Sequence, residues 1–309
     1  MNSNIIDQFK NLIFQLKLED DNKNIFKIKS FEKAVSILSN YPSEINNSDE
    51  LKGISGIGKG ILSRIDEILE TGFIQEVHTQ PDNSLLKFQE EIGTKTAINL
   101  YKQGIKTLDQ LNSLYKDGKI EVTHRIELIL KYSFGEKKFA DKIPRNEMKK
   151  YYHYFVDIFG KHDIEFKMCG SFRRKKKTSN DIDLLIFNKD LISNVIKLLE
   201  EKHFLLDHLT DNIATLNTVY RGYCVSFLDE NIVRRIDIRF IDLESKYTAI
   251  MYFTGSKNFN TKLRSKARSL GYKLNEYYLE KEGKNIYPKS EREIFNLLDV
   301  PYQKPQDRS

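Results

Sequence analysis

The N-terminal third of the chain has apolar residues at the spacing of amphipathic helices. In residues 4–19 the apolar side chains recur every three or four positions, and residues 29–41 repeat this pattern before Pro42. Side chains at this spacing fall on one face of an α-helix, and proline does not continue a helix. The pattern therefore predicts two helices, the second ending before Pro42.

Two glycine-containing turns follow, each placed before another amphipathic segment. The first is GISGIG at 53–58, before an apolar series that ends at Gly72, and the second is Ile92-Gly93, before a segment ending near Gly104. Such turns expose backbone N–H groups, and the next helix directs its positive N-terminal end at a bound anion. The pair forms a diverged repeat that we expect to bind nucleic-acid phosphates without reading bases. The alternative is an ordinary glycine-rich helix connection.

Beyond residue 144 the pattern changes to alternating helices and strands. Two segments with helical apolar periodicity occur at 150–162 and 190–204. Short alternating or β-rich runs predict strands at 164–171, 180–187, 221–229 and 233–241. We therefore expect helical units first, then an α/β body with antiparallel strands.

Charge and cysteine content indicate an anionic partner and a reducing compartment. The 309 residues are enough for two or more folding units, and a net charge of +6 favours a polyanion as partner. Cys169 and Cys224 lack any CxxC or Cys/His spacing, so neither a disulfide framework nor a structural zinc is expected. Without a membrane-length apolar run or a secretory pattern, we expect an intracellular protein with no membrane partner. The nucleus and a viral or cytoplasmic replication site both stay open.

Three aspartates lie on two of the predicted strands. Asp181 and Asp183 are two residues apart in NDIDLLIF, and Asp237 is in RRIDIRF. Residues two apart on a strand share a face, so the three carboxylates converge if the strands are neighbours. Converging carboxylates repel unless cations neutralise them, and two Mg²⁺ ions, for which Mn²⁺ can substitute, suit phosphate chemistry. For either strand alone, a solvated face with Asp–Arg pairs is the better interpretation.

A basic run lies just before the first two aspartates. Residues 169–177 read CGSFRRKKK, in which backbone N–H groups and the Ser171 hydroxyl can contact a triphosphate. Arg173 and Arg174 would add charge-assisted hydrogen bonds to the same anion. We interpret the lysines at 175–177 as a solvated loop, with a nuclear-import patch as the alternative.

These motifs together resemble the family X DNA polymerases over essentially the whole chain. The matching segments are CGSFRR, DID, RRIDIR, YFTGS, NEY, GIKTL, KIPR and QDRS. Gly-Ser before paired aspartates is shared by many nucleotidyltransferases, whereas YFTGS together with two helix-hairpin-helix units is far more specific. The resemblance implies an α+β multidomain fold, in which helical helix-hairpin-helix domains precede a nucleotidyltransferase palm with a mixed β-sheet and a small α/β C-terminal subdomain. The expected divisions are a lyase-type 5′-phosphate-binding domain at 1–80, a DNA-binding subdomain at 81–143, the catalytic palm at 144–245 and a nucleotide-selecting subdomain at 246–309.

The resemblance also implies roles for individual residues. Asp181 and Asp183 would bind both Mg²⁺ ions, and Asp237 would bind the catalytic ion and accept the proton of the primer 3′-hydroxyl. The nucleotide would contact Lys142, Ser171, Arg174, Asn180, Tyr252, Phe253, Gly255 and Asn260. DNA would contact Lys27, Gly56, Gly58, Lys59, Gly93, Arg235 and Arg264. A monovalent cation, Na⁺ or K⁺, would lie at the carbonyls of Lys52, Ile54 and Ile57 and at those of Lys87, Gln89 and Ile92.

Several positions depart from the family pattern. Lys142 stands where the family has arginine, Lys257 where it has aspartate, and Thr261 where it has lysine. The position of the lyase nucleophile holds Arg64 in place of lysine, and a guanidinium does not form a Schiff base. Lyase activity is therefore doubtful, and Lys59 is the candidate substitute nucleophile.

The leading hypothesis is a monomeric, template-directed DNA polymerase that fills short gaps in base-excision repair. Its partners would be gapped or nicked double-stranded DNA and deoxynucleoside triphosphates. A template-independent nucleotidyltransferase is one alternative, but such relatives carry a long loop in the palm hairpin, and this chain turns quickly at 229–231. A non-catalytic scaffold for gapped DNA is another, against which the presence of all three aspartates argues.

Overall fold

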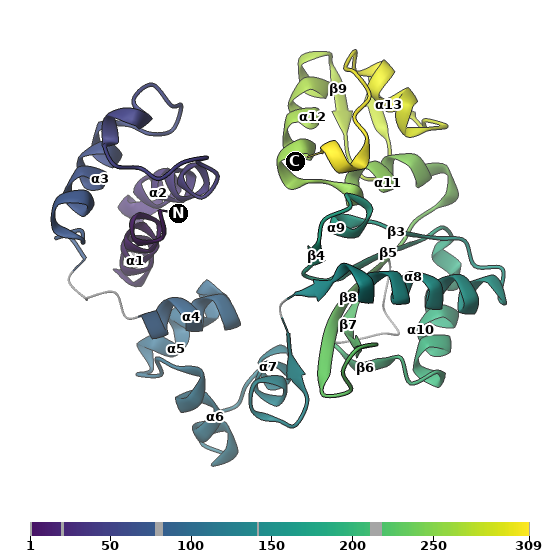
Figure 1. Cartoon of the computed structure of the whole chain (residues 1–309), viewed down its shortest axis with the longest axis horizontal. Coiled ribbons are helices and arrows are strands. Elements are labelled where there is room, and N and C mark those ends of the chain that lie inside the picture. Colours follow the sequence, from purple (N-terminus) through teal and green to yellow (C-terminus); the bar gives the residue numbers. More distant parts are fainter. Residues whose placement is uncertain (1, 20–21, 78–82, 141, 211–217, 309) are drawn as a thin grey trace. The chain divides into compact units, whose positions relative to one another are not determined.

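The computed structural model describes residues 2–19, 22–77, 83–140, 142–210 and 218–308, which fall into two compact units (Figure 1). The units comprise residues 1–129 and 130–309. The domain boundary predicted at residue 80 lies outside the described residues. Among those residues, no helix is long and apolar enough to cross a membrane.

The first unit is helical, as its apolar spacing predicts. Its helices are α1 (Ser3–Glu19), α2 (Ile25–Leu38), α3 (Lys59–Thr71), α4 (Asn83–Ile92), α5 (Thr94–Lys102) and α6 (Leu108–Lys116), and α7 (His124–Phe134) crosses into the second unit. The apolar faces of α1, α2 and α3 form one buried cluster that includes Phe9, Leu12 and Ile65. Helix α2 ends before Pro42, as expected. Leu69 is the exception on α3, because its side chain stays 39% exposed.

Both glycine turns have the backbone conformation that requires glycine. Gly56 has φ of +111°, and a β-carbon there would overlap the side chain of Lys33. Gly93 has φ of +89° at the start of α5, and Gly72 caps the end of α3 with φ of +86°. L-residues rarely adopt these values, so glycine at these positions is a structural requirement.

A mixed sheet forms the centre of the second unit (Figure 1). Its strands are β1 (Lys138–Phe139), β3 (Phe166–Met168), β5 (Ile182–Ile186), β6 (Leu205–His208), β7 (Val219–Val225) and β8 (Ile232–Phe240). The order is β3-β5-β8-β7-β6, with β1 also paired to β8. Strands β5 and β8 are parallel, whereas β3–β5, β6–β7 and β7–β8 are antiparallel. This mixture confirms the predicted fold class.

Helices pack on both faces of this sheet, but with different parts of it. Helices α8 (Arg145–Gly160) and α10 (Ile192–Glu201) pack on the face that carries Ile182, Ile236 and Ile238. On the other face, the end of β5 packs through Leu185 against α11 (Lys246–Thr254). Every second residue of β5 and β8 therefore points away from the helix-covered core, as the alternation predicts.

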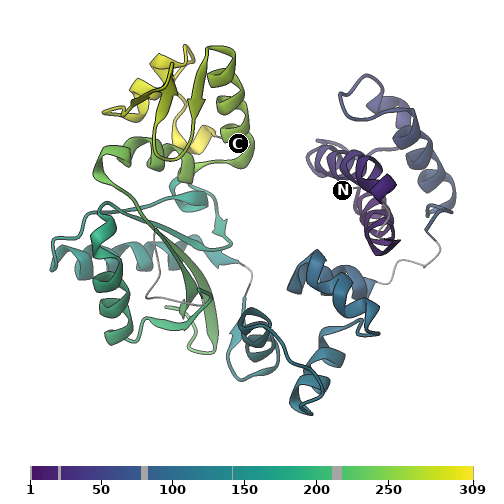
Figure 2. The same cartoon turned by 180° about the vertical axis from the view of Figure 1, so that it is seen from behind.

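The C-terminal part of the second unit has its own small core. It contains α12 (Lys257–Ser269), α13 (Glu291–Leu297) and an antiparallel sheet of β9 (Tyr272–Leu274), β10 (Leu279–Lys281) and β11 (Lys284–Ile286), which Figure 2 shows from behind. Two further short strands, β2 (Ile143–Pro144) and β4 (Thr178–Ser179), pair beside the short helix α9 (Gly170–Arg173). Single 3₁₀ turns occupy Asn22–Asn24, Ser48–Leu51, Lys189–Leu191, Leu243–Ser245 and Pro305–Asp307.

A buried carboxylate ties this C-terminal part to α9. Glu291 accepts hydrogen bonds from Arg173 (Nη1–Oε1 3.0 Å) and from Arg308 (Nη1–Oε1 2.7 Å). Its side chain is 10% exposed, and that of Arg308 is fully buried. Burial alone would raise the pKa of Glu291, but hydrogen bonding and the charge of Arg173, together with Arg308, lower it. Glu291 is therefore ionised and neutralises part of the positive charge of buried Arg308 and partly buried Arg173.

Glu291→Gln should destabilise the second unit by about 3 kcal/mol at neutral pH, because it leaves the buried Arg308 and the partly buried Arg173 without this negative partner. The stabilisation from a lowered carboxyl pKa is present above the ordinary glutamate range and is lost as the pH falls through the folded-state pKa. The unfolding temperatures of the variant and the wild type should therefore converge in acid. Calorimetry between pH 3 and pH 8 checks this, with exposed Glu282→Gln as the control; a constant difference would contradict it.

Candidate active site

Strand pairing brings the predicted aspartates to neighbouring positions. Asp183 on β5 lies directly opposite Asp237 on the parallel strand β8, and Asp181 precedes β5 by one residue. The inward neighbours Ile182 and Ile236 are fully buried, so the aspartates lie on the opposite face. The condition on which the convergence depended, that the two strands are neighbours, is met.

An arginine on the same strand engages one of the three carboxylates. Arg235 lies two residues before Asp237 and binds it through Nε–Oδ1 (3.1 Å) and Nη2–Oδ2 (3.2 Å). Arg221 adds a longer contact of 3.7 Å to the same carboxylate. Within the described part of the chain, no three His, Cys, Asp or Glu side chains are disposed as a formed metal centre. Asp237 thus has the Asp–Arg pairing that a solvated strand face would show, whereas Asp181 and Asp183 are in a different environment.

Burial and mutual repulsion raise the pKa of the other two carboxyl groups. Burial, with the charges of Asp181 and Asp237 added, raises the pKa of Asp183 to about 8. Burial and then the charge of Asp237 raise the pKa of Asp181 as well. Clustered carboxylates at raised pKa are the donor set that a hard divalent cation favours, because the cation replaces the protons. The donor chemistry of Asp181 and Asp183 therefore suits a divalent cation, whereas Asp237 would first have to leave Arg235 to join them.

The glycine before Ser171 is required by the position of an aspartate. Gly170 has φ of +53°, and a β-carbon on it would overlap the carboxylate of Asp183. The Cys169 N–H also donates to the Asp183 carbonyl at 2.9 Å. The Gly-Ser motif is therefore packed directly against the β5 carboxylate, which explains why the two motifs occur so close in the sequence.

A cleft of about 840 Å³ opens beside these aspartates. Asp181 and Asp183 line it, and Asp183 also lines a small adjoining pocket with Asp237. The basic side chains around the cleft are Lys142, Arg174, Lys176, Lys177, Lys257 and Arg264. Six cations facing two carboxyl groups make this a site for an anion large enough to span the cleft.

The eight residues that the family resemblance places at the nucleotide all line this cleft. They come from four separate parts of the second unit: Lys142, then Ser171 and Arg174, then Asn180, and then Tyr252, Phe253, Gly255 and Asn260. Arg264, expected at DNA, lines it as well, and so do the two divergent positions Lys257 and Thr261. The roles of these residues stay predictions; their common location is a property of the fold.

Two buried polar atoms in the cleft have no hydrogen-bond partner among the described residues, Arg174 Nε and Asn260 Oδ1. The other atoms of the same side chains are engaged, since Arg174 Nη1 donates to the Thr254 carbonyl and Asn260 Nδ2 donates to the Tyr252 carbonyl at 2.7 Å. Lys142 Nζ donates to Asn180 Oδ1 at 2.6 Å. Buried polar atoms are rarely left unsatisfied, so a bound ligand is the natural partner for both atoms.

The expectation that Arg173 contacts the triphosphate is wrong. Its guanidinium turns away from the cleft to Glu291 and the Thr254 hydroxyl (Nη1–Oγ1 2.6 Å). Of two adjacent arginines in CGSFRR, only Arg174 lines the cleft. Lys176 and Lys177 line the cleft too, while remaining exposed as a solvated loop would be.

The residues expected at the DNA backbone and at monovalent cations lie in the first unit, apart from Arg235 and Arg264. Lys27 on α2 and Lys59 at the first position of α3 are exposed. Gly58 is the N-cap of α3 and Gly93 that of α5. In the first turn, which follows Lys52, the Ile54 carbonyl accepts from Ile57 N–H. Lys87, Gln89 and Ile92 lie on α4, where the Gln89 carbonyl accepts from Gly93 N–H. Cation binding at these carbonyls stays a prediction.

Arg64 is held by its neighbours on α3 and beyond. Its Nη2 donates to Glu76, lying 2.6 Å from Oε1 and 2.8 Å from Oε2, and its Nη1 donates to the Gly60 carbonyl at 2.7 Å. Its guanidinium also lies 5.2 Å from the ring centre of Phe31. These contacts suit a planar, permanently charged group, so Arg64 is built into the domain as a structural cation.

Sequence reasoning missed one buried ion pair close to the cleft. Arg234 and Glu147 are 4% and 0% exposed, and Arg234 Nη2 lies 2.8 Å from Glu147 Oε2. The signal that could have found it is the alternation of β8, because Arg234 is in phase with the inward residues Ile236 and Ile238. A charge at an inward position requires a buried partner.

Comparisons with known proteins agree with this geometry. Residues 1–74 match the family described as "Helix-hairpin-helix domain", residues 142–243 "DNA polymerase beta palm" and residues 249–309 "DNA polymerase beta thumb". Similar proteins include DNA polymerase lambda of Arabidopsis thaliana (26% identical, covering 100% of this chain and 62% of the relative) and of Rattus norvegicus (27%, 90% and 52%). Another is the DNA polymerase/3′-5′ exonuclease PolX of Bacillus subtilis (26%, 98% and 54%). The chain therefore spans little more than half the length of these relatives.

Asp183→Asn should change how stability depends on pH when divalent ions are chelated. A carboxyl pKa raised to about 8 stabilises the fold at low pH, and this stabilisation is lost as the pH rises from about 4 to 8. The wild type should therefore lose more stability than the variant between pH 5 and pH 9. Unfolding temperatures in a chelating buffer check this, with exposed Asp163→Asn as the control. Parallel curves for wild type and Asp183→Asn would refute the raised pKa.

Proposed function

This chain belongs to the family X DNA polymerases, and we propose that it fills short gaps in double-stranded DNA by template-directed nucleotidyl transfer. The observation that carries the proposal is the cleft in which Asp181 and Asp183 face six basic side chains, with Asp237 opposite Asp183 on the next strand. Carboxylates for metal ions and cations for a triphosphate thus meet in one space. The substrates would be gapped or nicked DNA and deoxynucleoside triphosphates, and the enzyme would act as a monomer.

The chain's own residues would divide the work around the triphosphate. Lys142, Ser171 and Arg174 would bind the phosphate oxygens, with Arg174 Nε available as a further donor. The three aspartates would hold two Mg²⁺ ions, which when bound neutralise charge on the reacting phosphate and make the primer 3′-hydroxyl more acidic. Asp237 would take up the proton of that hydroxyl, for which its carboxylate must be released from Arg235.

Residues on the other side of the cleft would select the nucleotide. Tyr252, Phe253 and Gly255 would flank the sugar, and the backbone there would exclude a ribose 2′-hydroxyl. Asn260 and Arg264 would contact the nascent base pair and the template from the minor groove. Lys257 adds a positive charge at the same rim, where the family has a negative one.

The helical unit would bind DNA without reading its sequence. The glycine turns would present N–H groups to phosphates, aided by Na⁺ or K⁺ at the turn carbonyls, and Lys27 would contact the 5′-phosphate at the far side of the gap. Base-excision repair is the process in which such gaps arise, and we assign the enzyme to it inside the cell.

The short β7–β8 hairpin supports template-directed synthesis over template-independent addition. Strand β7 ends at Val225 and β8 begins at Ile232, so six residues connect them. A loop of this length is too short to take the place of a template strand.

Primer extension tests the proposed reaction. Wild-type protein with Mg²⁺ should extend the primer in gapped DNA and leave a single-stranded primer nearly unextended. Asp237→Ala should slow extension by about a thousand-fold or more, because a metal ligand and proton acceptor is lost. Its affinity for gapped DNA should stay within about two-fold of wild type.

The control is Asp242→Ala, a partly exposed position that does not line the cleft, and this variant should extend the primer normally. Equal extension of single-stranded primers would instead indicate template-independent transfer. Tight binding of gapped DNA by a wild type that does not extend would indicate a scaffold.

We further propose that the N-terminal domain anchors the 5′ end without strong lyase activity. Arg64 cannot supply the attacking amine, and its contacts with Glu76, Gly60 and Phe31 are those of a structural cation. Lys59 is the substitute candidate, but its exposed position at the first residue of α3 provides little orientation for the attack.

Borohydride trapping on a pre-incised abasic substrate should give little adduct with wild type and more with Arg64→Lys, since lysine restores a primary amine in that pocket. Efficient trapping by wild type would overturn this. If that trapping disappears in Lys59→Ala, Lys59 is the nucleophile; if it persists, another amine is.

A further inference from the structure

An arginine in the sheet core is the starting point of the inference. Arg234 on β8 is in phase with the inward-facing Ile236 and Ile238, both fully buried, and is itself only 4% exposed. Removing a guanidinium from water costs several kcal/mol unless it is both paired and hydrogen bonded. The groups that Arg234 contacts therefore indicate which parts of the chain it stabilises.

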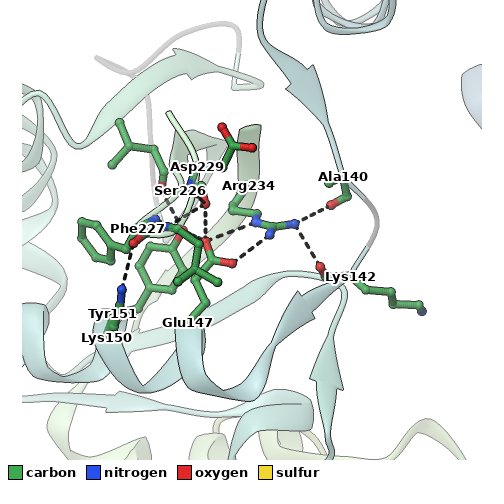
Figure 3. Close-up of polar contacts among 11 residues, drawn as sticks. Ala140, Lys142, Glu147, Lys150, Tyr151, Ser226, Phe227, Asp229 and Arg234 are labelled. Atoms are coloured by element: carbon green, nitrogen blue, oxygen red, sulfur yellow. Dashed lines mark hydrogen bonds and ion pairs between the residues drawn. The ribbon is translucent and has the colours of Figure 1, made fainter. Parts of the chain in front are cut away.

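One side of the guanidinium is paired with a glutamate. Glu147, in the first turn of α8 and fully buried, accepts from Arg234 Nη2 (2.8 Å to Oε2) and Nε (3.3 Å to Oε1). The same carboxylate accepts from Tyr151 Oη at 3.0 Å and Ser226 Oγ at 2.6 Å (Figure 3). Glu147 is thus fixed by several donors, and it fixes Arg234 in turn.

The other side of the guanidinium holds main chain. Arg234 Nη1 donates to the carbonyls of Ala140 (3.1 Å) and Lys142 (3.0 Å). The preceding residues 138–139 form β1, which pairs with β8 at Ile232 and Val233. Strand β8 therefore contacts this part of the main chain twice, by pairing with β1 and through the hydrogen bonds of Arg234 to Ala140 and Lys142.

The residue held in this way carries a basic side chain into the cleft. In Figure 3 the Lys142 side chain leads away from the network, and its Nζ reaches Asn180 Oδ1 at 2.6 Å. The next residue, Ile143, pairs with Ser179 on β4. The main chain at Lys142 is thus fixed between Arg234 on one side and β4 on the other.

We propose that Arg234 is a positioning residue for nucleotide binding, which acts through Lys142. Because Arg234 donates a hydrogen bond to the carbonyl of Lys142, it determines where the ammonium group of Lys142 meets the triphosphate. An apolar pair in place of Arg234 and Glu147 would fill the core equally well, but it would not hold two carbonyls. The proposal rests on the proposed function, in which Lys142 binds the triphosphate.

The primary test is Arg234→Lys, which keeps a positive charge beside Glu147. A lysine ammonium lacks the planar fork that reaches a carboxylate and two carbonyls together. We expect a folded protein whose KM for dTTP on gapped DNA is raised about ten-fold while kcat stays within about two-fold, because ground-state binding is affected. An unchanged KM would overturn the proposal.

Tyr151→Phe is the matched control within the same network. It removes the hydrogen bonds to Glu147 and to the Val225 carbonyl but leaves the two carbonyl contacts of Arg234 in place. Its unfolding temperature should fall while its KM for dTTP stays at the wild-type value. A KM raised as much as in Arg234→Lys would show that only general stability matters, and would overturn the proposal.

A double-mutant cycle asks whether Arg234 acts through Lys142. Lys142→Ala and Arg234→Lys should each raise KM, and the combined variant should be no worse than Lys142→Ala alone, because the positioned group is then absent. If instead the two increases in KM multiply in the combined variant, the two residues act independently and the proposal is overturned. If Arg234→Lys does not fold, Glu147→Met with Arg234→Met removes the grip without leaving an unpaired charge, and the same cycle applies to it.

Calorimetric binding of dTTP separates this proposal from the function on which it rests. The titration needs no turnover, so a wild type that binds dTTP without extending primers would refute the polymerase reaction alone. The positioning role would still require weaker dTTP binding in Arg234→Lys and wild-type binding in Tyr151→Phe. Equal binding by all three proteins would overturn the positioning role alone.

Discussion

The parallel pairing of β5 with β8 is the constraint on which the site depends. Its register sets Asp183 opposite Asp237, and it does so with Ile182 opposite Ile236 in the core behind them. A shift of one residue would turn the isoleucines outward and bury the aspartates, so the apolar core enforces the register. The packing of the apolar neighbours therefore brings the carboxylates together, although their mutual repulsion and burial are electrostatically unfavourable.

That cost is visible in the surroundings of the three carboxyl groups. Asp183 lies against Gly170 at a distance that excludes any side chain there, and burial raises its pKa to about 8. Asp237 is relieved by Arg235 on its own strand. A raised pKa on Asp183 and the pairing of Asp237 with Arg235 both reduce the repulsion within the cluster, and a divalent cation can take over this role.

Buried arginines fix the segments around this centre. Arg234 holds the main chain at Lys142 through two carbonyls, and Arg173 with Arg308 holds the C-terminal part through Glu291. Each guanidinium joins pieces of chain that are distant in sequence, and each is paired with a carboxylate that is nearly or fully buried. Such links give a defined geometry where apolar packing alone would permit several, because hydrogen bonds to a planar group are directional.

Local patterns determined much of this protein. Helices α1, α2, α3 and α5, the glycine turns, strands β3, β5, β7 and β8, and the shared face of Asp181 and Asp183 follow from the spacing of apolar residues and from the stereochemistry of glycine. The sequence does not show which of two adjacent, chemically similar residues faces the site, because that depends on the tertiary structure. Arg173 and Arg174 are chemically identical neighbours, yet the rotation of α9 sends one to Glu291 and the other into the cleft.

The buried pair of Arg234 and Glu147 likewise required the tertiary structure. Its two members are 87 residues apart and only the fold brings them together. Alternation along β8 signals that Arg234 points inward, but it does not say what the arginine would meet there. Local sequence determines which way a side chain faces, whereas the identity of its partner depends on the packing of separate elements, and this is why the site's supporting contacts emerged only with the fold.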